Sequence, residues 1–206
     1  MTVTEIKAKN KSKFFVCLDH EVVFVLYKGD FNKYHLVEGE TVNPEEYEEI
    51  MTEVLPKRAM NRSYKLLLSR DYTVKQLQDK LSGDGYPREI IESTVEKLKE
   101  EKFLDDERFT ENYIFWKSQT KSRKRMMMDL NRKGIDYGTA SDAYDDLLEK
   151  NDIDNEETII RKFLDKKGFS ADSASYEEKQ KMSQTLLRKG FSYESIHHIL
   201  GYHPFP

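Results

Sequence analysis

One pattern of two apolar residues and a glycine occurs three times along this chain. In the first copy, Leu77, Leu81 and Gly85 follow one another at intervals of four residues. The same intervals return in two further copies: Met126, Leu130 and Gly134, then Met182, Leu186 and Gly190. Residues four apart share one face of a helix, and a glycine just past a helix supplies the positive φ of its C-terminal cap. The glycines are 49 and then 56 residues apart, and such a period is the signature of stacked helical repeats.

Each copy of the pattern is expected to belong to a unit of three helices. After the first glycine, Ile91, Val95 and Leu98 share the face of a second helix. Before the pattern, the apolar pair Met60 and Tyr64 indicates another helix. The predicted fold is therefore mainly α, a tandem repeat of three three-helix units. A mean hydropathy of −0.79 favours an elongated, curved array with much exposed surface.

The first 56 residues differ from the rest of the chain. Three short stretches rich in β-branched and aromatic residues predict a small antiparallel sheet, with a hairpin turn at Asp19 and His20. Asn43 and Pro44 then start a helix that is expected to stop at Pro56. The predicted domains are an N-terminal extension and three repeats: 1–56, 57–104, 105–150 and 151–206.

Capping residues mark several of the expected helix starts. Thr73 with Gln76, and Ser175 with Glu178, have the spacing of the capping box, in which side chain and backbone satisfy each other. Ser192 precedes the last short helix in the same way. These local signals fall where the repeat pattern requires a helix to begin, and they therefore support it independently.

Composition limits the cellular setting of the protein. No run of 18 apolar residues occurs, the N-terminus lacks the pattern of a signal peptide, and Cys17 is the single cysteine. A lone cysteine cannot form an intramolecular disulfide. We therefore expect a cytoplasmic protein, monomeric and without a membrane partner.

Motifs that carry catalysis are not found. The chain has no phosphate-binding glycine loop and no nucleophile elbow, and Cys17 lies in an expected strand, where packing is its usual role. His197, His198 and His203 lack further ligands at metal spacing and are interpreted as surface histidines. We predict no catalytic residue, no metal and no cofactor.

Two patterns of side chains lie near the middle of the chain. Phe109, Tyr113 and Trp116 share one helical face, which favours a place in the core over base stacking.

From residue 117 to residue 133 there are seven basic residues and one acid, Asp129. On a helix, several of these cations and Met128 fall within about 100° of arc, opposite the apolar residues of the repeat pattern.

This cationic stripe predicts a polyanionic partner, either nucleic acid or an acidic protein groove. The competing interpretation is a lysine-rich helix that is merely solvated. The residues predicted to bind are Lys117, Lys121, Lys124, Arg125, Arg132 and Lys133.

Three segments resemble the bacterial RecX family. They are the FLDDERF run at 103–109, the KRxxxDLxxKGI run at 124–135 and the LxxxLxxxGYP run at 77–87. The chain departs from the family pattern at 121–124, where many members carry a glycine, and at His20, where glycine is usual.

The resemblance implies tandem three-helix repeats and binding to the filament of the RecA recombinase. It also implies inhibition of strand exchange and of the coupled ATPase, and in some members binding to single- or double-stranded DNA. The family signature is interpreted as mainly structural, with Asp105 as a helix cap and with Leu104 and Phe109 in the core. Its residues are Leu104, Asp105, Asp106, Glu107, Arg108 and Phe109.

An alternative is a DNA-binding regulator that acts alone, because a helix, a glycine turn and a second helix resemble a helix-turn-helix. Against it, Ile90, Ile91 and Val95 make the supposed recognition helix apolar, and the net charge of the chain is −4. A third possibility is a scaffold without any nucleic-acid contact, which predicts binding that does not depend on salt.

Overall fold

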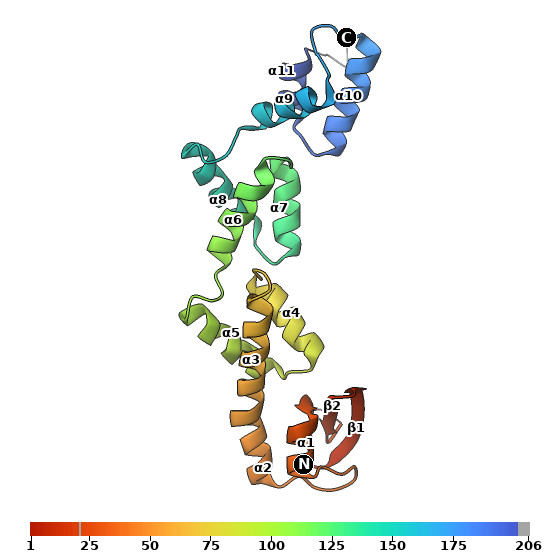
Figure 1. The fold of residues 1–206 in the computed structure, drawn as a ribbon, viewed down its shortest axis with the longest axis vertical. Helices are drawn as coiled ribbons and strands as arrows, with labels where there is room; N and C mark the ends of the chain where they lie inside the picture. The colour runs from red at the N-terminus through yellow and green to blue at the C-terminus, as the bar shows by residue number, and fades with distance from the viewer. Residues whose placement is uncertain (21, 202–206) are drawn as a thin grey trace. The chain divides into compact units, whose positions relative to one another are not determined.

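The computed structural model describes residues 1–20 and 22–201, and the chain is mainly helical with one small sheet (Figure 1). This confirms the predicted fold class. The strands are β1 Val3–Asn10, β2 Lys13–Leu18 and β3 Val22–Tyr27. The helices are α1 Lys28–Tyr34, α2 Pro44–Glu49, the π-helix η1 Ile50–Val54, α3 Leu55–Leu67, α4 Val74–Asp84, α5 Arg88–Glu100, α6 Asp106–Ser118, α7 Arg123–Arg132, α8 Tyr137–Glu149, α9 Glu156–Lys167, α10 Tyr176–Arg188 and α11 Tyr193–Leu200.

The chain divides into two compact units, Met1–Asp105 and Asp106–Pro206. We call them the N-terminal unit and the C-terminal unit. The N-terminal unit holds the sheet and α1 to α5, and the C-terminal unit holds α6 to α11. Helices α3 to α5, α6 to α8 and α9 to α11 each surround one copy of the glycine pattern. The boundaries of the four predicted domains, and the curvature of the array, stay predictions.

The sheet of the N-terminal unit is an antiparallel meander in the order β1-β2-β3. Asp19 and His20 both adopt positive φ, 48° and 63°, as the tight turn of a right-twisted hairpin requires. Side chains of the sheet share one hydrophobic core with α3, α4 and α5, in which Val16, Leu77 and Leu98 are fully buried. The extension and the first three-helix group therefore fold around a common core.

The expected helix end at Pro56 is wrong. Helices α2, η1 and α3 follow one another without a break, and Pro56 lies in the first turn of α3. In the wide π-turn before it, the Leu55 N–H donates to the carbonyl of Ile50, five residues back. A proline needs no hydrogen bond at its own nitrogen, and a widened turn relieves its clash with the preceding carbonyl. The helix therefore continues through it.

The repeat glycines behave as the sequence predicts. Gly85, Gly134 and Gly190 have φ values of 96°, 95° and 88°, which a side chain disfavours. The predicted capping boxes form at Thr73 and at Ser175. These signals are local, so they hold whatever the rest of the chain does.

The C-terminal unit contains two hydrophobic clusters. One lies around Ile114, Met126 and Leu130 of α6 and α7, and the other around Ile160 and Leu186 of α9 and α10. The apolar residues of the glycine pattern thus lie at the centre of each three-helix group. What remains on the outside of these helices is available for binding.

The predicted core position of Trp116 is wrong, because its side chain is 66% exposed. The buried face of α6 consists of Thr110, Ile114 and Ser118. The two hydroxyls donate to carbonyls of their own helix, at 2.7 and 2.9 Å, so burying them leaves no polar group unsatisfied. Phe109 and Tyr113 pack at the edge of the core, and Trp116 lies on the side of the helix away from Ile114.

Candidate functional site

The predicted cationic stripe lies on α7 and on the segment that leads into it. Ser122 caps α7, since its hydroxyl accepts from the N–H of Arg125 at 3.3 Å. The same hydroxyl donates to the carbonyl of Lys189 at 2.9 Å. Met126, Met127 and Leu130 bury the opposite face of the helix. Lys124, Arg125 and Arg132 are therefore exposed on a helix that is anchored at its start and along its inner face.

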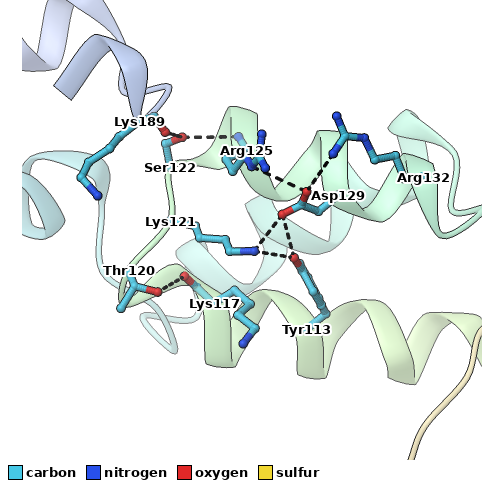
Figure 2. Close-up of polar contacts among 9 residues, drawn as sticks. All are labelled: Tyr113, Lys117, Thr120, Lys121, Ser122, Arg125, Asp129, Arg132 and Lys189. Atoms are coloured by element: carbon cyan, nitrogen blue, oxygen red, sulfur yellow. Dashed lines mark hydrogen bonds and ion pairs between the residues drawn. The ribbon is translucent and has the colours of Figure 1, made fainter. Parts of the chain in front are cut away.

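Asp129 gathers three of the predicted cations around one carboxylate (Figure 2). Lys121 Nζ lies 2.8 Å from its Oδ2, while Arg125 Nε and Arg132 Nη1 lie 3.6 and 3.8 Å from its Oδ1. Tyr113 donates to the same carboxylate and accepts from Lys121, both at 3.1 Å. The stripe is thus an ordered cluster with one acid at its centre.

This cluster holds its charges firmly at neutral pH. The hydrogen bond from Lys121 is the main reason that the pKa of Asp129 lies below its ordinary value. The bond to Asp129 likewise raises the pKa of Lys121. Burial raises the pKa of the Tyr113 phenol, which therefore stays protonated and able to donate. Three cations around one carboxylate leave an excess of two positive charges on this surface.

The other predicted binding residues stand outside the cluster. Lys117 is exposed near the end of α6, and Lys124 is exposed on the first turn of α7. The Lys133 ammonium lies over the rings of Phe109 and Tyr113, 5.9 and 5.8 Å from their centroids. The structure therefore joins Lys121, Arg125 and Arg132, and leaves Lys117 and Lys124 separate from them.

The family signature crosses the boundary between the two compact units. Leu104 is buried in the core of the N-terminal unit, which ends at Asp105. Asp106 and Glu107 form the first turn of α6, where acids are favoured by the helix dipole. Phe109 packs against the core of the C-terminal unit. Glu107 and Arg108 are exposed. The structural role of this signature stays a prediction.

A groove of about 1050 Å³ opens beside α7 within the C-terminal unit. Its walls come from α7, from α8 and from the turn between α10 and α11. The residues lining it are Arg123, Lys124, Met127, Met128, Asn131, Tyr137, Tyr144, Leu148, Glu156, Leu187, Gly190, Phe191, Ser192 and Tyr193. Lys124 and Met128 therefore connect the stripe to an apolar hollow.

Four large apolar or aromatic side chains are exposed along this groove: Met128, Tyr137, Leu187 and Tyr193. Met128 belongs to the predicted stripe, but the other three were missed from the sequence. A signal was present, because Tyr137 and Tyr193 each stand three residues after a repeat glycine. The corresponding residue of the first repeat is Arg88.

The predicted histidines and possible metal sites can be compared with the structure. Among residues 1–20 and 22–201, no cluster of histidine, cysteine or carboxylate side chains could hold a metal. His198 pairs with Glu157 at 2.6 Å, and His203 lies outside the described residues. Within the same residues, no helix is both long and apolar enough to cross a membrane.

Comparison with known families points to one group of proteins. Residues 59–98 match the first three-helix domain of RecX, and residues 155–200 match its third. The regulatory protein RecX of Caldanaerobacter subterraneus subsp. tengcongensis is 29% identical over 203 residues, covering 98% of this chain and 99% of that protein. The protein of the same name from Streptococcus mutans is 26% identical, with 97% and 98% covered.

Solved structures agree with this similarity. A crystal structure of regulatory protein RecX superposes with a TM-score of 0.60 at 21% identity, covering 97% of this chain and 98% of that one. RecX from Lactobacillus salivarius gives a TM-score of 0.59 at 25% identity, covering 72% of this chain and 96% of that one. The fold built of three-helix groups is therefore shared with these proteins.

Proposed function

The chain belongs to the RecX family of regulatory proteins, and from this premise we propose that it binds the nucleoprotein filament of the RecA recombinase. Binding would inhibit strand exchange and the coupled ATPase, and so modulate homologous recombination and DNA repair in the cytoplasm. The resemblance found in the sequence is the first support for this proposal. The cationic surface of α7 is the second.

The observation that carries the proposal is the arrangement around Asp129. A carboxylate that orients Lys121, Arg125 and Arg132 fixes a positive surface in advance of binding, which reduces the entropy lost when a partner is bound. Lys117 and Lys124 add exposed cations on α6 and α7, and the half-buried Lys133 follows the end of α7. A recombinase filament offers both DNA phosphates and acidic protein side chains to such a surface.

The proposed mechanism is occupation of the filament groove. A repeat array that lies along this groove would exclude the homologous duplex. It would also hinder the movements of neighbouring subunits that accompany ATP turnover. The groove beside α7 adds exposed apolar contacts, from Met128 and Tyr193 among others, to the attraction between charges.

The alternative of a stand-alone helix-turn-helix regulator has less support. In the N-terminal unit the helix after the repeat glycine is α5, where Ile90 and Ile91 are 6% exposed and Val95 is 1% exposed. A recognition helix needs free side chains to contact base edges. Helix α5 instead directs these residues into the core.

The test is ATP hydrolysis by the RecA recombinase on single-stranded DNA, titrated with this protein at two salt concentrations. We expect inhibition that weakens at the higher salt, because screening reduces attraction between charges. The double variant Lys124→Glu and Arg125→Glu should raise the half-inhibitory concentration by about tenfold or more at low salt. Its free energy of unfolding should change little, since both side chains are largely exposed.

The matched control carries the same change of charge at exposed lysines elsewhere in the C-terminal unit, Lys150→Glu and Lys181→Glu. It should inhibit like the wild type. Equal inhibition by both double variants would reject the assignment to α7. A folded wild-type protein that fails to inhibit at any ratio would reject the proposed function.

A further inference from the structure

Four lysines surround a second hollow of the C-terminal unit. This hollow has a volume of about 490 Å³, within the range of small-ligand sites. It is lined by the turn after α6, by α9 and by the turn after α10. The lining residues are Gln119, Thr120, Ile159, Lys162, Phe163, Lys166, Lys167, Lys189 and Phe191, with no carboxylate among them. We call this hollow the lysine pocket.

The lysines of this pocket are little neutralised. Lys162 pairs with Asp154, but no ion pair within the described part of the chain engages Lys166, Lys167 or Lys189. The Lys189 ammonium instead lies 4.9 Å from the ring centroid of Phe163. Figure 2 shows its side chain extending toward the Thr120 side of the loop, away from Arg125. The pocket therefore combines lysine ammonium groups with the aromatic rings of Phe163 and Phe191.

The gathering of these charges is not a consequence of overall composition. Residues 106–206 carry 17 basic and 18 acidic side chains, so the C-terminal unit is nearly neutral. Lysines at a helix C-terminus are favoured by the dipole, which accounts for Lys166 and Lys167. It does not account for Lys189, which comes from another element. Lys162 and Lys166 also stand four apart on α9, a spacing at which like charges repel.

The turn that presents Lys189 is built to hold its place. The Lys189 carbonyl accepts from the buried Ser122 hydroxyl at 2.9 Å. The next residue, Gly190, has a φ of 88°, and a Cβ there would come within 2.8 Å of that hydroxyl oxygen. Phe191 is buried beneath the turn. The backbone of Lys189 is therefore held against the start of α7, while its side chain meets Phe163 of α9.

An exposed aromatic residue stands four positions before Thr120, a residue that lines the pocket. Trp116, the single tryptophan of the chain, precedes Thr120 by one helical turn. Its ring is 66% exposed and is held edge-on by Phe115, with 5.3 Å between the centroids. Sites for single-stranded nucleic acid combine cations that hold phosphates with aromatic rings on which bases stack. The pocket supplies the cations, and Trp116, one helical turn before Thr120, supplies an exposed ring.

We propose that the lysine pocket binds the phosphate groups of a single-stranded nucleic acid and that Trp116 stacks on one of its bases. A single strand fits better than a duplex, because only unpaired bases offer their faces to a ring. This inference rests on the proposed function for its biological role and deepens it. It assigns the DNA contact to α9 and Lys189, and leaves the α7 surface for the recombinase.

Binding is tested with the full chain, without recombinase, by the fluorescence anisotropy of a labelled oligothymidylate. Lys166→Gln with Lys167→Gln should weaken binding by on the order of 20-fold at 0.1 M salt and lower the slope of log K against log salt by about 1.4. Trp116→Ala should weaken binding about tenfold without changing that slope. The control pair Lys150→Gln and Lys181→Gln should bind like the wild type.

The source of the phosphate is decided by the intrinsic fluorescence of Trp116. An unlabelled oligothymidylate should quench it, whereas inorganic polyphosphate should compete for the pocket without quenching. The inference is overturned if the oligonucleotide does not quench Trp116. It is also overturned if the variant with Lys166→Gln and Lys167→Gln binds like the wild type. Strand binding through this pocket without inhibition of the recombinase ATPase would instead reject the proposed function alone. Inhibition without strand binding would reject the inference alone.

Discussion

Two aspartates, one in each compact unit, each meet three basic side chains, and the origin of those side chains differs. Asp84, at the end of α4, lies 2.7 Å from Arg62 of α3, 3.3 Å from Lys13 of β2 and 3.8 Å from Lys9 of β1. The cations at Asp129 all come from α7 itself and from the segment just before it. One cluster therefore joins distant parts of the chain, and the other joins neighbours.

Exposure follows the same division. At Asp84, the side chains of Lys9, Lys13 and Arg62 are 25%, 14% and 34% exposed. At Asp129, those of Lys121, Arg125 and Arg132 are 33%, 49% and 64% exposed. Both carboxylates are only 15% exposed. The acid is thus covered in each case, but only the second cluster has cations that are about half exposed or more, Arg125 and Arg132.

The difference shows how one arrangement of charges can serve two purposes. At Asp84, the ion pairs connect β1 and β2 to α3 and α4. They therefore stabilise the packing of the sheet against the helices of the N-terminal unit. The hydrogen bond from Arg62 and the charge of Lys13 hold the pKa of Asp84 below its ordinary value, although burial, the largest single influence, raises it. At Asp129 the same chemistry arranges a surface.

The largest effect is expected from Asp84→Ala. It leaves three cations close together with no counter-charge, and removing one partner of a buried ion pair costs on the order of 3 kcal/mol. The free energy of unfolding is measured in urea by far-UV circular dichroism. The control is Asp79→Ala on the same helix, whose partner Lys75 is half exposed, and it should cost less than about 0.5 kcal/mol. Equal losses for the two variants would mean that Asp84 does not join the sheet to the helices.

A smaller effect is expected where the repeat glycine of the N-terminal unit meets the sheet. Gly85 has a φ of 96°, and a Cβ there would lie 2.2 Å from the ring of Phe15. Gly85→Ala should therefore lower the free energy of unfolding by about 2 kcal/mol, through backbone strain and displacement of the ring. Gly83→Ala, two residues earlier within α4, meets nothing within 4 Å and should raise it by roughly 0.5 kcal/mol. Urea unfolding of both variants checks the opposite signs.

The smallest effect on stability is expected from Asp129→Asn. Arg125 and Arg132 are 49% and 64% exposed and can be solvated, so the loss should stay below about 1 kcal/mol. Removing the negative charge should at the same time strengthen attraction to a polyanion, roughly fivefold at 0.1 M salt. The half-inhibitory concentration in the recombinase ATPase assay measures this gain. A weaker inhibitor than the wild type would show that Asp129 acts mainly by holding Lys121, Arg125 and Arg132 in position.

Features determined by neighbouring residues could be predicted from the sequence. The capping boxes at Thr73 and Ser175 and the positive φ of the repeat glycines need only a few residues to form. The apolar spacing placed Leu77, Met126 and Leu186 in the cores where the structure has them. Charge counting along the chain likewise predicted a basic surface at α7.

Tertiary structure alone decided the features that depend on residues far apart. A proline usually ends a helix, and only a π-turn that packs well lets the helix continue at Pro56. Trp116 is exposed because small hydroxyl side chains fill the buried face of α6. The lysine pocket joins α9 to a turn more than 20 residues away, so no spacing rule along the sequence contains it. Local periodicity records which face of a helix is buried, whereas long-range packing determines which of its outer residues meet.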